Sequence, residues 1–465
     1  MRIFNSKTHR MEEFVPVKEG EVKIYNCGPT VYNYLHIGNA RASLMFDAFR
    51  RYLIEKGYKV TYVQNITDID DKMINRANEE GITVKELGDK FIAAFFEDAD
   101  ALGIQRADVH PKATEHIDEI IELIKRLEEK GLAYRSEDGV YFDTHAYDKY
   151  GAFIGQDLED LESGARVDVD ENKKNPADFV LWKAWKPGEP YWESPWGRGR
   201  PGWHIECSAM SMKYLGETFD FHCGGQDLCF PHHENETAQS EGATGKTFVN
   251  YWMHNGFINV NNEKMSKSKG EVFYVRDIMK QYRPDVLRLF LLSSHYRSPI
   301  NYSNDLLEQS KSALERLHNA KENYEFIEKA NAECEITDEQ REFMGSIGDY
   351  RRRFDECMDD DFNTAGAIGV MFELVRDANA LVITGANSAV AKAAKDALME
   401  LAGILGLLGE QDGDEIVPEI MELVEKRQQA RAQKNWAEAD AARDRLKALG
   451  YAVEDTPQGA KVKKL

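Results

Sequence analysis

Two short motifs, far apart in the chain, constrain its fold more than any other feature. The tetrapeptide HIGN occupies residues 36–39, and the pentapeptide KMSKS occupies residues 264–268. Either motif alone could arise by chance. In this order and at this separation, they predict one active site that binds ATP from two sides and transfers an adenylate group. Lys264 and Lys267 would neutralise phosphate charge in the transition state, and His36 would open a helix against the same phosphates.

The segment around the first motif has the pattern of a strand–helix–strand unit. Residues 22–25 predict a strand, residues 40–56 carry the apolar stripe of a helix, and residues 59–64 alternate as a second strand. Gly57 is a typical helix-ending residue. Such a unit belongs to a parallel, doubly wound sheet. Ligands of these sheets bind at the carboxyl ends of the strands, where Gly38 would let a flat base approach the backbone.

The chain has 465 residues, which is too many for one ordinary hydrophobic core. A stretch rich in Tyr, Trp, Gly and Pro interrupts the alternation of strands and helices, and a long helical pattern follows the second motif. We therefore expect a split catalytic domain (1–125 and 201–250), an insertion (126–200), a connecting region with the second motif (251–310), a helical bundle (311–405) and a C-terminal unit (416–465).

A net charge of −22 argues against nucleic-acid binding by the chain as a whole. The charge is not uniform, because residues 421–465 hold ten Lys or Arg against seven Asp or Glu. The acidic, Gly-containing stretch 409–415 before them is typical of a linker. The tail is therefore either an RNA-binding unit or a solvated helical surface, and charge alone does not separate the two.

The second chemical motif is PHHENE at residues 231–236. Pro231 suits the first turn of a helix, and His232 and Glu236 would then lie at i and i+4 on one face. This spacing suits two ligands of one zinc ion, and Cys27 and Cys207 could supply two thiolates. The alternative is an exposed histidine and buried, apolar cysteines.

Two further cysteines, Cys223 and Cys229, stand nearer to the motif in the sequence than the other two and leave the ligand set open. The six cysteines are scattered, which favours free thiols or metal ligands over disulfides. The chain has no run of about eighteen apolar residues and no charged-then-apolar leader. The sequence therefore predicts a cytoplasmic protein with no membrane partner.

Several blocks together give the chain a resemblance to the bacterial type of cysteinyl-tRNA synthetase, a class I aminoacyl-tRNA synthetase, over essentially its full length. The blocks are YNCGPTVY (25–32), GWHIECSAM (202–210), FPHHENE (230–236), KMSKS (264–268) and DDFNTA (360–365). The resemblance implies a class I doubly wound, Rossmann-like α/β catalytic domain with an insertion. An α-helical bundle and a small C-terminal anticodon-binding domain would follow, in a monomer.

The resemblance also implies the site residues. The family's zinc ligands match Cys27, Cys207, His232 and Glu236. Its ATP-binding elements match His36, Gly38, Asn39, Lys264 and Lys267, with Lys267 on the phosphates, and its Gly-rich segment beside the adenosine matches Gly224, Gly225 and Asp227. The positions that close around the amino acid match Thr67 and Trp203.

The implied partners are L-cysteine, ATP and tRNA(Cys), with one Zn²⁺ per chain and Mg²⁺ on the ATP. The cysteine carboxylate would attack the α-phosphorus, and the terminal ribose hydroxyl of the tRNA would then take the cysteinyl group. Zinc would select the substrate thiolate over serine's hydroxyl. Candidates in the tail for contacts with the anticodon are Arg427, Arg431, Lys434, Trp436, Arg443 and Arg445.

The sequence departs from the family pattern in four places. Asn39 stands where His is common, Cys223 where Gly is usual, and Cys229 where an aliphatic residue is usual; the C-terminus lacks an aromatic residue. Two other functions also remain open. One is a ligase of the same fold that passes cysteine to an amino-sugar, although such relatives lack the tail. The other is a zinc-stabilised RNA-binding protein without catalysis, against which both lysines and all four expected ligands argue.

Overall fold

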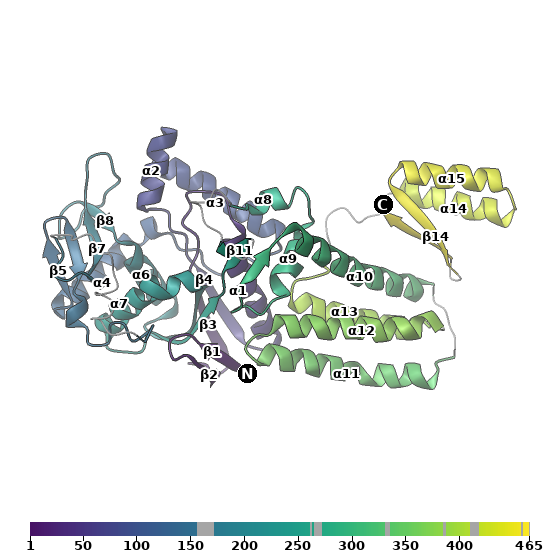
Figure 1. Cartoon of the computed structure of the whole chain (residues 1–465), viewed down its shortest axis with the longest axis horizontal. Helices are drawn as coiled ribbons and strands as arrows, with labels where there is room; N and C mark the ends of the chain where they lie inside the picture. The colour runs from purple at the N-terminus through teal and green to yellow at the C-terminus, as the bar shows by residue number, and fades with distance from the viewer. Residues whose placement is uncertain are drawn as a thin grey trace. The chain divides into compact units, whose positions relative to one another are not determined.

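The computed structural model describes residues 1–155, 172–260, 263–264, 272–330, 335–384, 387–409, 418–456 and 459–464. Figure 1 shows the whole chain, coloured by residue number. The chain divides into two units. The first comprises Met1–Lys311 and Glu356–Gly366, and the second comprises Ser312–Asp355 and Ala367–Leu465.

The first unit is built on a four-stranded parallel sheet. Its strand order is β10 (Val249–Asn255), β9 (Phe219–Gly225), β3 (Glu21–Asn26) and β4 (Lys59–Gln64). Helix α1 (Ile37–Glu55) connects β3 to β4 and completes the predicted strand–helix–strand unit. Strand β9 is buried along almost its whole length, as expected of a parallel strand covered on both faces.

Helices α2 (Asp71–Glu80), α3 (Val84–Ala101), α4 (Ile117–Glu129), α6 (Trp203–Leu215) and α7 (Glu234–Thr244) complete this part. A short hairpin of β1 (Arg2–Asn5) and β2 (Arg10–Glu13) begins the chain. The side chain of Asp70 caps α2, and Thr83 and Glu86 form a capping box on α3.

The segment predicted as an insertion contains a second, antiparallel sheet. Its order is β5 (Ala133–Ser136), β6 (Gly139–Phe142), β7 (Phe179–Ala184) and β8 (Gly199–Pro201). Apolar side chains of this sheet, such as Phe142 and Trp182, share a core with Ile120 and Leu127 of α4 and Ile205 of α6. This packing joins the second sheet to the helices that carry the motifs.

A third sheet follows the parallel one and consists of β11 (Ile258–Val260), β12 (Glu263–Lys264) and β13 (Ile300–Tyr302). Helices α8 (Val275–Ile278) and α9 (Pro284–Leu292) lie between β12 and β13 in the sequence. The buried guanidinium of Arg41 in α1 donates to the carbonyl oxygens of Gly256 and Ser298, at 2.7 and 2.6 Å. Arg41 thus ties the helix of the first motif to the ends of this sheet.

The second unit is helical and ends in a small α/β tail. Its long helices are α10 (Asn304–Lys329, begun in the first unit), α11 (Asp338–Asp359), α12 (Thr364–Thr384) and α13 (Ser388–Ile404). The tail has α14 (Pro418–Ala432), α15 (Trp436–Ala448) and an antiparallel hairpin of β14 (Tyr451–Thr456) and β15 (Gly459–Lys464). The sequence had not predicted this hairpin. None of the described helices is long and apolar enough to cross a bilayer.

Candidate active site and metal-binding cluster

The turn after β3 places Cys27 at the carboxyl end of the parallel sheet. The N–H group of Cys27 donates to the carbonyl oxygen of Cys223 in the neighbouring strand β9, at 3.0 Å. The next residue must be glycine, because a Cβ on Gly28 would lie 1.7 Å from the backbone oxygen of Asn65. The Gly28 N–H group in turn donates to the Asn65 side chain at 2.8 Å. This close approach fixes Cys27 at the edge where such sheets bind ligands.

Helix α6, helix α7 and the short helical turn before α7 (Cys229–His233) supply the other residues of the cluster. A Cβ on Gly202, directly before α6, would lie 2.1 Å from the carbonyl oxygen of Val180 in β7, so α6 begins tightly against the second sheet. Cys207 follows in the first half of α6. His232 and Glu236 lie at i and i+4, with Nε2 and Oε1 3.0 Å apart. Both side chains are buried. Ionisable side chains are rarely buried unless they pair with one another or bind a metal.

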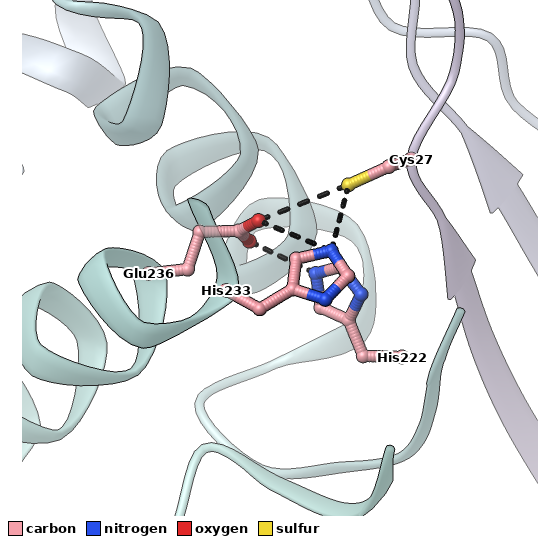
Figure 2. A group of neighbouring side chains, drawn as sticks. All are labelled: Cys27, His222, His233 and Glu236. Carbon is pink, nitrogen blue, oxygen red and sulfur yellow. Dashed lines mark hydrogen bonds and ion pairs between the residues drawn. The ribbon is translucent and has the colours of Figure 1, made fainter. Parts of the chain in front are cut away.

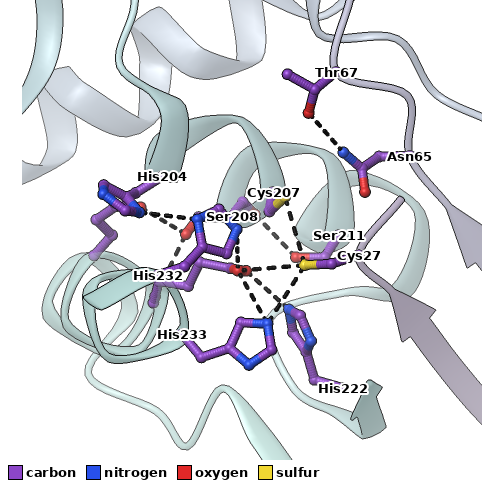
Figure 3. Close-up of polar contacts among 12 residues, drawn as sticks. Cys27, Asn65, Thr67, His204, Cys207, Ser208, Ser211, His222, His232 and His233 are labelled. Carbon is purple, nitrogen blue, oxygen red and sulfur yellow. Dashed lines mark hydrogen bonds and ion pairs between the residues drawn. The ribbon is translucent and has the colours of Figure 1, made fainter. Parts of the chain in front are cut away.

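The structure brings Cys27, Cys207, His232 and Glu236 together, with one ligand atom of each within 4.8 Å of the others. Figure 3 labels the first three of these residues, and Figure 2 labels Glu236. The two sulfur atoms are 3.9 Å apart, and Cys27 Sγ lies 3.8 Å from Glu236 Oε1. A tetrahedral zinc ion with ordinary bond lengths needs ligand atoms about 3.3–3.8 Å apart. Two sulfurs, one imidazole and one carboxylate at this spacing fit a zinc ion.

A second group of possible ligands shares Cys27 and Glu236 with the first, and adds His222 and His233 (Figure 2). His222 Nε2 lies 2.9 Å from Glu236 Oε2, and His233 Nε2 lies 3.5 Å from Cys27 Sγ. The other ring nitrogen of His233 lies 2.7 Å from His254 Nε2. The first group has two thiols and therefore the softer donors, which zinc favours. The histidines of the second group are placed to orient the shared carboxylate and thiol.

The buried charges of the cluster stabilise one another. Burial alone would raise the pKa of Glu236, but the neighbouring His222 and His232 rings lower it to about 2. Burial opposes the charged form of His232, yet Glu236 and Cys207 raise its pKa to about 10. A hydrogen bond from Cys27, with help from His232, lowers the pKa of Cys207 to about 6. Burial and the neighbouring Cys207 raise the pKa of Cys27 well above its usual value.

A cavity of about 350 Å³ opens beside the cluster. Its walls come from the turn after β3, the start of α1, the start of α6 and the end of β9. Seven of the residues expected in the site line it, namely Cys27, His36, Gly38, Asn39, Trp203, Gly225 and Asp227. The expected ATP-binding and amino-acid-binding residues on these elements therefore face one space.

Two other expected site residues, Gly224 and Thr67, are not among those that line this cavity. Gly224 is buried in β9, where a Cβ would lie 3.0 Å from both His233 and Leu228. Thr67 is buried and accepts a hydrogen bond from the Asn65 side chain at 3.3 Å. Lys264 lies in β12, and its backbone pairs with Asn259 of β11. Lys267 lies outside the described residues.

His36 has a defined role at the start of α1. It is the N-cap residue, and its Nδ1 accepts a hydrogen bond from the backbone N–H group of Asn39 at 3.3 Å. In the neutral ring the proton must then be on Nε2, which can donate to a phosphate oxygen. The cap and the helix N-terminus together give this wall of the cavity an affinity for anions.

Sequence reasoning missed His222 and His233 as members of the cluster. His222 lies within a strand and belongs to no motif, so only the pairing of β9 with β3 brings it to Cys27. His233 was visible in the motif PHHENE, but the i and i+4 spacing selected its neighbour. Cys223 and Cys229 belong to none of the three groups of possible metal ligands found among the described residues.

Three family descriptions match the chain in sequence. Residues 13–312 match "tRNA synthetases class I (C) catalytic domain", residues 353–409 match "DALR domain", and residues 413–462 match "Cysteinyl-tRNA ligase anticodon binding domain". A curated relative from Clostridioides difficile (strain 630), named cysteine--tRNA ligase, is 53% identical over 465 residues, which is 100% of both chains.

Solved structures show the same fold at low sequence identity. The Mycobacterium tuberculosis methionyl-tRNA synthetase in complex with methionyl-adenylate has a TM-score of 0.64 at 16% identity, over 83% of this chain and 89% of the other. A putative arginyl-tRNA synthetase from Campylobacter jejuni has a TM-score of 0.60 at 10% identity, over 84% and 93%. The α/β class I fold, with its insertion and helical C-terminal region, is thus confirmed. With the full-length relative and the three matched families, the chain belongs to the cysteinyl-tRNA synthetase family.

Proposed function

We propose that the chain activates L-cysteine with ATP to give cysteinyl-adenylate, and then transfers cysteine to the 3′ end of tRNA(Cys). As a member of this family, the chain is a cysteine–tRNA ligase that forms AMP and diphosphate. The observation that carries the proposal is the position of Cys27. This residue belongs to the four-residue cluster and also lines the cavity that His36, Gly38 and Asn39 face.

The proposed metal is one zinc ion, held by Cys27, Cys207, His232 and Glu236. Their donor types and the distances between their ligand atoms support this assignment. When bound, zinc supplies a Lewis acid that the substrate thiolate can bind and that serine's hydroxyl binds far more weakly. The chain's own contribution is to hold three buried donors and one half-buried donor at a fixed spacing beside the cavity.

The proposed ATP site lies on the other walls of the cavity. His36 and Asn39 would contact phosphate, Gly38, Gly224, Gly225 and Asp227 would lie around the adenosine, and Thr67 and Trp203 would close around cysteine. The cysteine carboxylate attacks the α-phosphorus, and magnesium diphosphate leaves. No side-chain nucleophile is needed, so positioning and charge carry the rate. Lys264 and Lys267 are the proposed cations that stabilise charge on the leaving diphosphate.

The acceptor is proposed to be tRNA, with the C-terminal unit 416–465 as its anticodon-binding domain. The match of residues 413–462 to an anticodon-binding family supports this over an amino-sugar acceptor. Lys434, Trp436, Arg443 and Arg445 are exposed in the tail, whereas Arg427 is only 7% exposed and is poorly placed for contact with RNA. We also propose that the chain is a monomer, that it is cytoplasmic, and that its domain limits are those expected from the sequence.

Two assays on the purified chain test this function. Pyrophosphate exchange should depend on cysteine and should be absent with serine. Charging with bulk tRNA should give a cysteinyl ester that mild base removes. Exchange without charging would favour another acceptor for the activated cysteine. Absence of both from a zinc-loaded protein would contradict the proposed catalysis.

A further inference from the structure

Glu206 is a buried carboxylate in α6, one residue before Cys207. Its side chain is 1% exposed, and no described group forms a hydrogen bond with its Oε2 atom. A buried carboxylate oxygen without a partner is costly, and native proteins rarely keep one unless it has a use. Trp203 lies one helical turn before Glu206, so both side chains fall on the same side of α6.

The cavity beside Glu206 is distinct from the one that holds the ATP motif. It has a volume of about 610 Å³, and Thr30, Asp70, Trp203 and His204 line it together with Glu206. Thr30 and Trp203 line both cavities, so the two spaces meet at these residues. Trp203 is 37% exposed at this junction.

The electrostatics of this corner favour a cation. Burial raises the pKa of the Glu206 carboxyl well above its usual value, the charges of Cys207, Asp68 and Asp70 raise it further, and a hydrogen bond with Thr67 opposes this rise. Asp68 already accepts hydrogen bonds from the backbone N–H and the hydroxyl of Thr114, and Asp70 caps α2. One oxygen of Glu206, Oε2, has no donor among the described residues.

Two of the five cations that line this cavity are paired with other carboxylates, and the other three are Lys72, Lys173 and Lys186. Lys183 pairs with Asp71 at 2.5 Å, and Arg200 pairs with Asp71 and with Glu189, the latter at 3.0 Å. All four residues line the same cavity as Glu206. Among the described residues no cation donates to Glu206 Oε2, which leaves this oxygen open to a donor from a ligand.

Cysteine supplies such a cation at the right place. Its ammonium nitrogen is three bonds from its sulfur atom. Glu206 lines the cavity that meets, at Thr30 and Trp203, the cavity lined by Cys27, one of the proposed ligands of the metal that takes the sulfur. We propose that Glu206 receives the α-ammonium group of the substrate cysteine. This assignment rests on the proposed function and makes Glu206 a further substrate-binding residue. With the thiolate on the metal and the ammonium group on Glu206, the carboxylate of the substrate would be directed toward ATP.

The test compares two thiols that differ only in the ammonium group. Binding of L-cysteine and of 3-mercaptopropionate, which is cysteine without its amino group, is measured calorimetrically on the zinc-loaded chain. The wild type should prefer L-cysteine. Glu206→Gln should lower the affinity for L-cysteine about 10- to 100-fold, because a charge-assisted hydrogen bond is lost. The affinity for 3-mercaptopropionate should change by no more than about twofold.

Asp138→Asn is the matched control, since Asp138 lines the same cavity from the second sheet and accepts a hydrogen bond from Tyr141. This variant should keep the preference for L-cysteine, and a loss equal to that of Glu206→Gln would overturn the assignment. An equal loss of both thiols in Glu206→Gln, or no loss of either, would also overturn it.

A third variant covers the case in which Glu206→Gln no longer holds zinc. Glu206→Asp keeps the carboxylate but shortens the side chain, so the affinity for L-cysteine should fall more than the affinity for 3-mercaptopropionate. An equal fall in both affinities would contradict the assignment. The wild type separates this proposal from the proposed function. If it binds both thiols equally, only the role of Glu206 fails. If it binds neither thiol, the zinc–thiolate chemistry fails as well.

Discussion

At the scale of single residues, the cluster controls the protonation of its own members. Above pH 6 the paired thiols of Cys27 and Cys207 together hold one proton, because Cys207 has a pKa of about 6 and burial raises the pKa of Cys27 well above its usual value. Glu236 is ionised, with a pKa of about 2. His232, with a pKa of about 10, carries a proton that a metal would have to displace.

Zinc uptake by the metal-free protein should therefore release about two protons near pH 7, one from the thiol pair and one from His232. Zinc binding should weaken as the pH falls, because the raised pKa values of Cys27 and His232 keep both protons in place at lower pH. Calorimetry in two buffers with different ionisation enthalpies measures the number of protons. Release of none would contradict the proposed ligands, because an oxygen-only site has no such protons to lose.

The variant Cys207→Ser should lose zinc and cysteine-dependent pyrophosphate exchange together. Serine's hydroxyl is a poor zinc ligand and leaves three donors in the cluster. Metal content by mass spectrometry and the exchange rate measure the two effects. Cys223→Ala is the matched control, because Cys223 is also a buried thiol but lies in β9 outside both clusters. A full zinc content in Cys207→Ser, or its loss in Cys223→Ala, would contradict the assignment.

At the scale of elements, one glycine sets where α6 begins. A methyl group on Gly202 would lie 2.1 Å from the carbonyl oxygen of Val180, which is part of the backbone and cannot move aside easily. Gly202→Ala should therefore shift the start of α6 and destabilise the protein by about 1–3 kcal/mol. Zinc retention should fall as well, since α6 carries Cys207.

Gly345→Ala is the control for this prediction. Gly345 lies in α11, and a Cβ there meets no atom within 4 Å. The change should stabilise the protein slightly, by about 0.5–1 kcal/mol, because alanine favours a helix. Thermal unfolding and metal content measure both variants. Equal stability of the two would show that the contact with Val180 can relax.

Elements that obey a local rule could be predicted from the sequence, and elements formed by distant pairing could not. The strand at residues 22–25, the helix at 40–56 and the strand Gly139–Phe142 followed from apolar periodicity and turn residues, and each corresponds to an observed element. The hairpin β14–β15 was missed, although alternation and the PQG sequence at 457–459 signal a turn between strands. His222 was missed because its role arises from the pairing of β9 with β3.

At the scale of the whole molecule, the chain combines an acidic body with a small tail of opposite charge. The tail has its own apolar core of Ile420, Val424 and Leu446, packed against residues of its hairpin. Its excess of cations stands against a total charge of −22. The cluster of possible metal ligands, the ATP motif and the residues expected to contact the amino acid all belong to the first unit. Activation of cysteine and attraction of RNA are thus assigned to different parts of the chain.

Deletion of residues 416–465 should therefore separate the two half-reactions. Cysteine-dependent pyrophosphate exchange should stay nearly intact, because its residues lie in the first unit. Charging of tRNA should fall by at least about tenfold through lost affinity, and the difference from the full chain should shrink as salt rises, because the lost contacts are with phosphate. A Lys434→Ala, Arg445→Ala double variant, which removes two exposed cations but keeps the fold of the tail, should show a smaller loss with the same salt dependence.

Equal loss of exchange and charging on deletion would make the tail a structural support for the first unit. An unchanged rate of charging would mean that the tail does not bind tRNA, and an acceptor other than tRNA would then have to be sought.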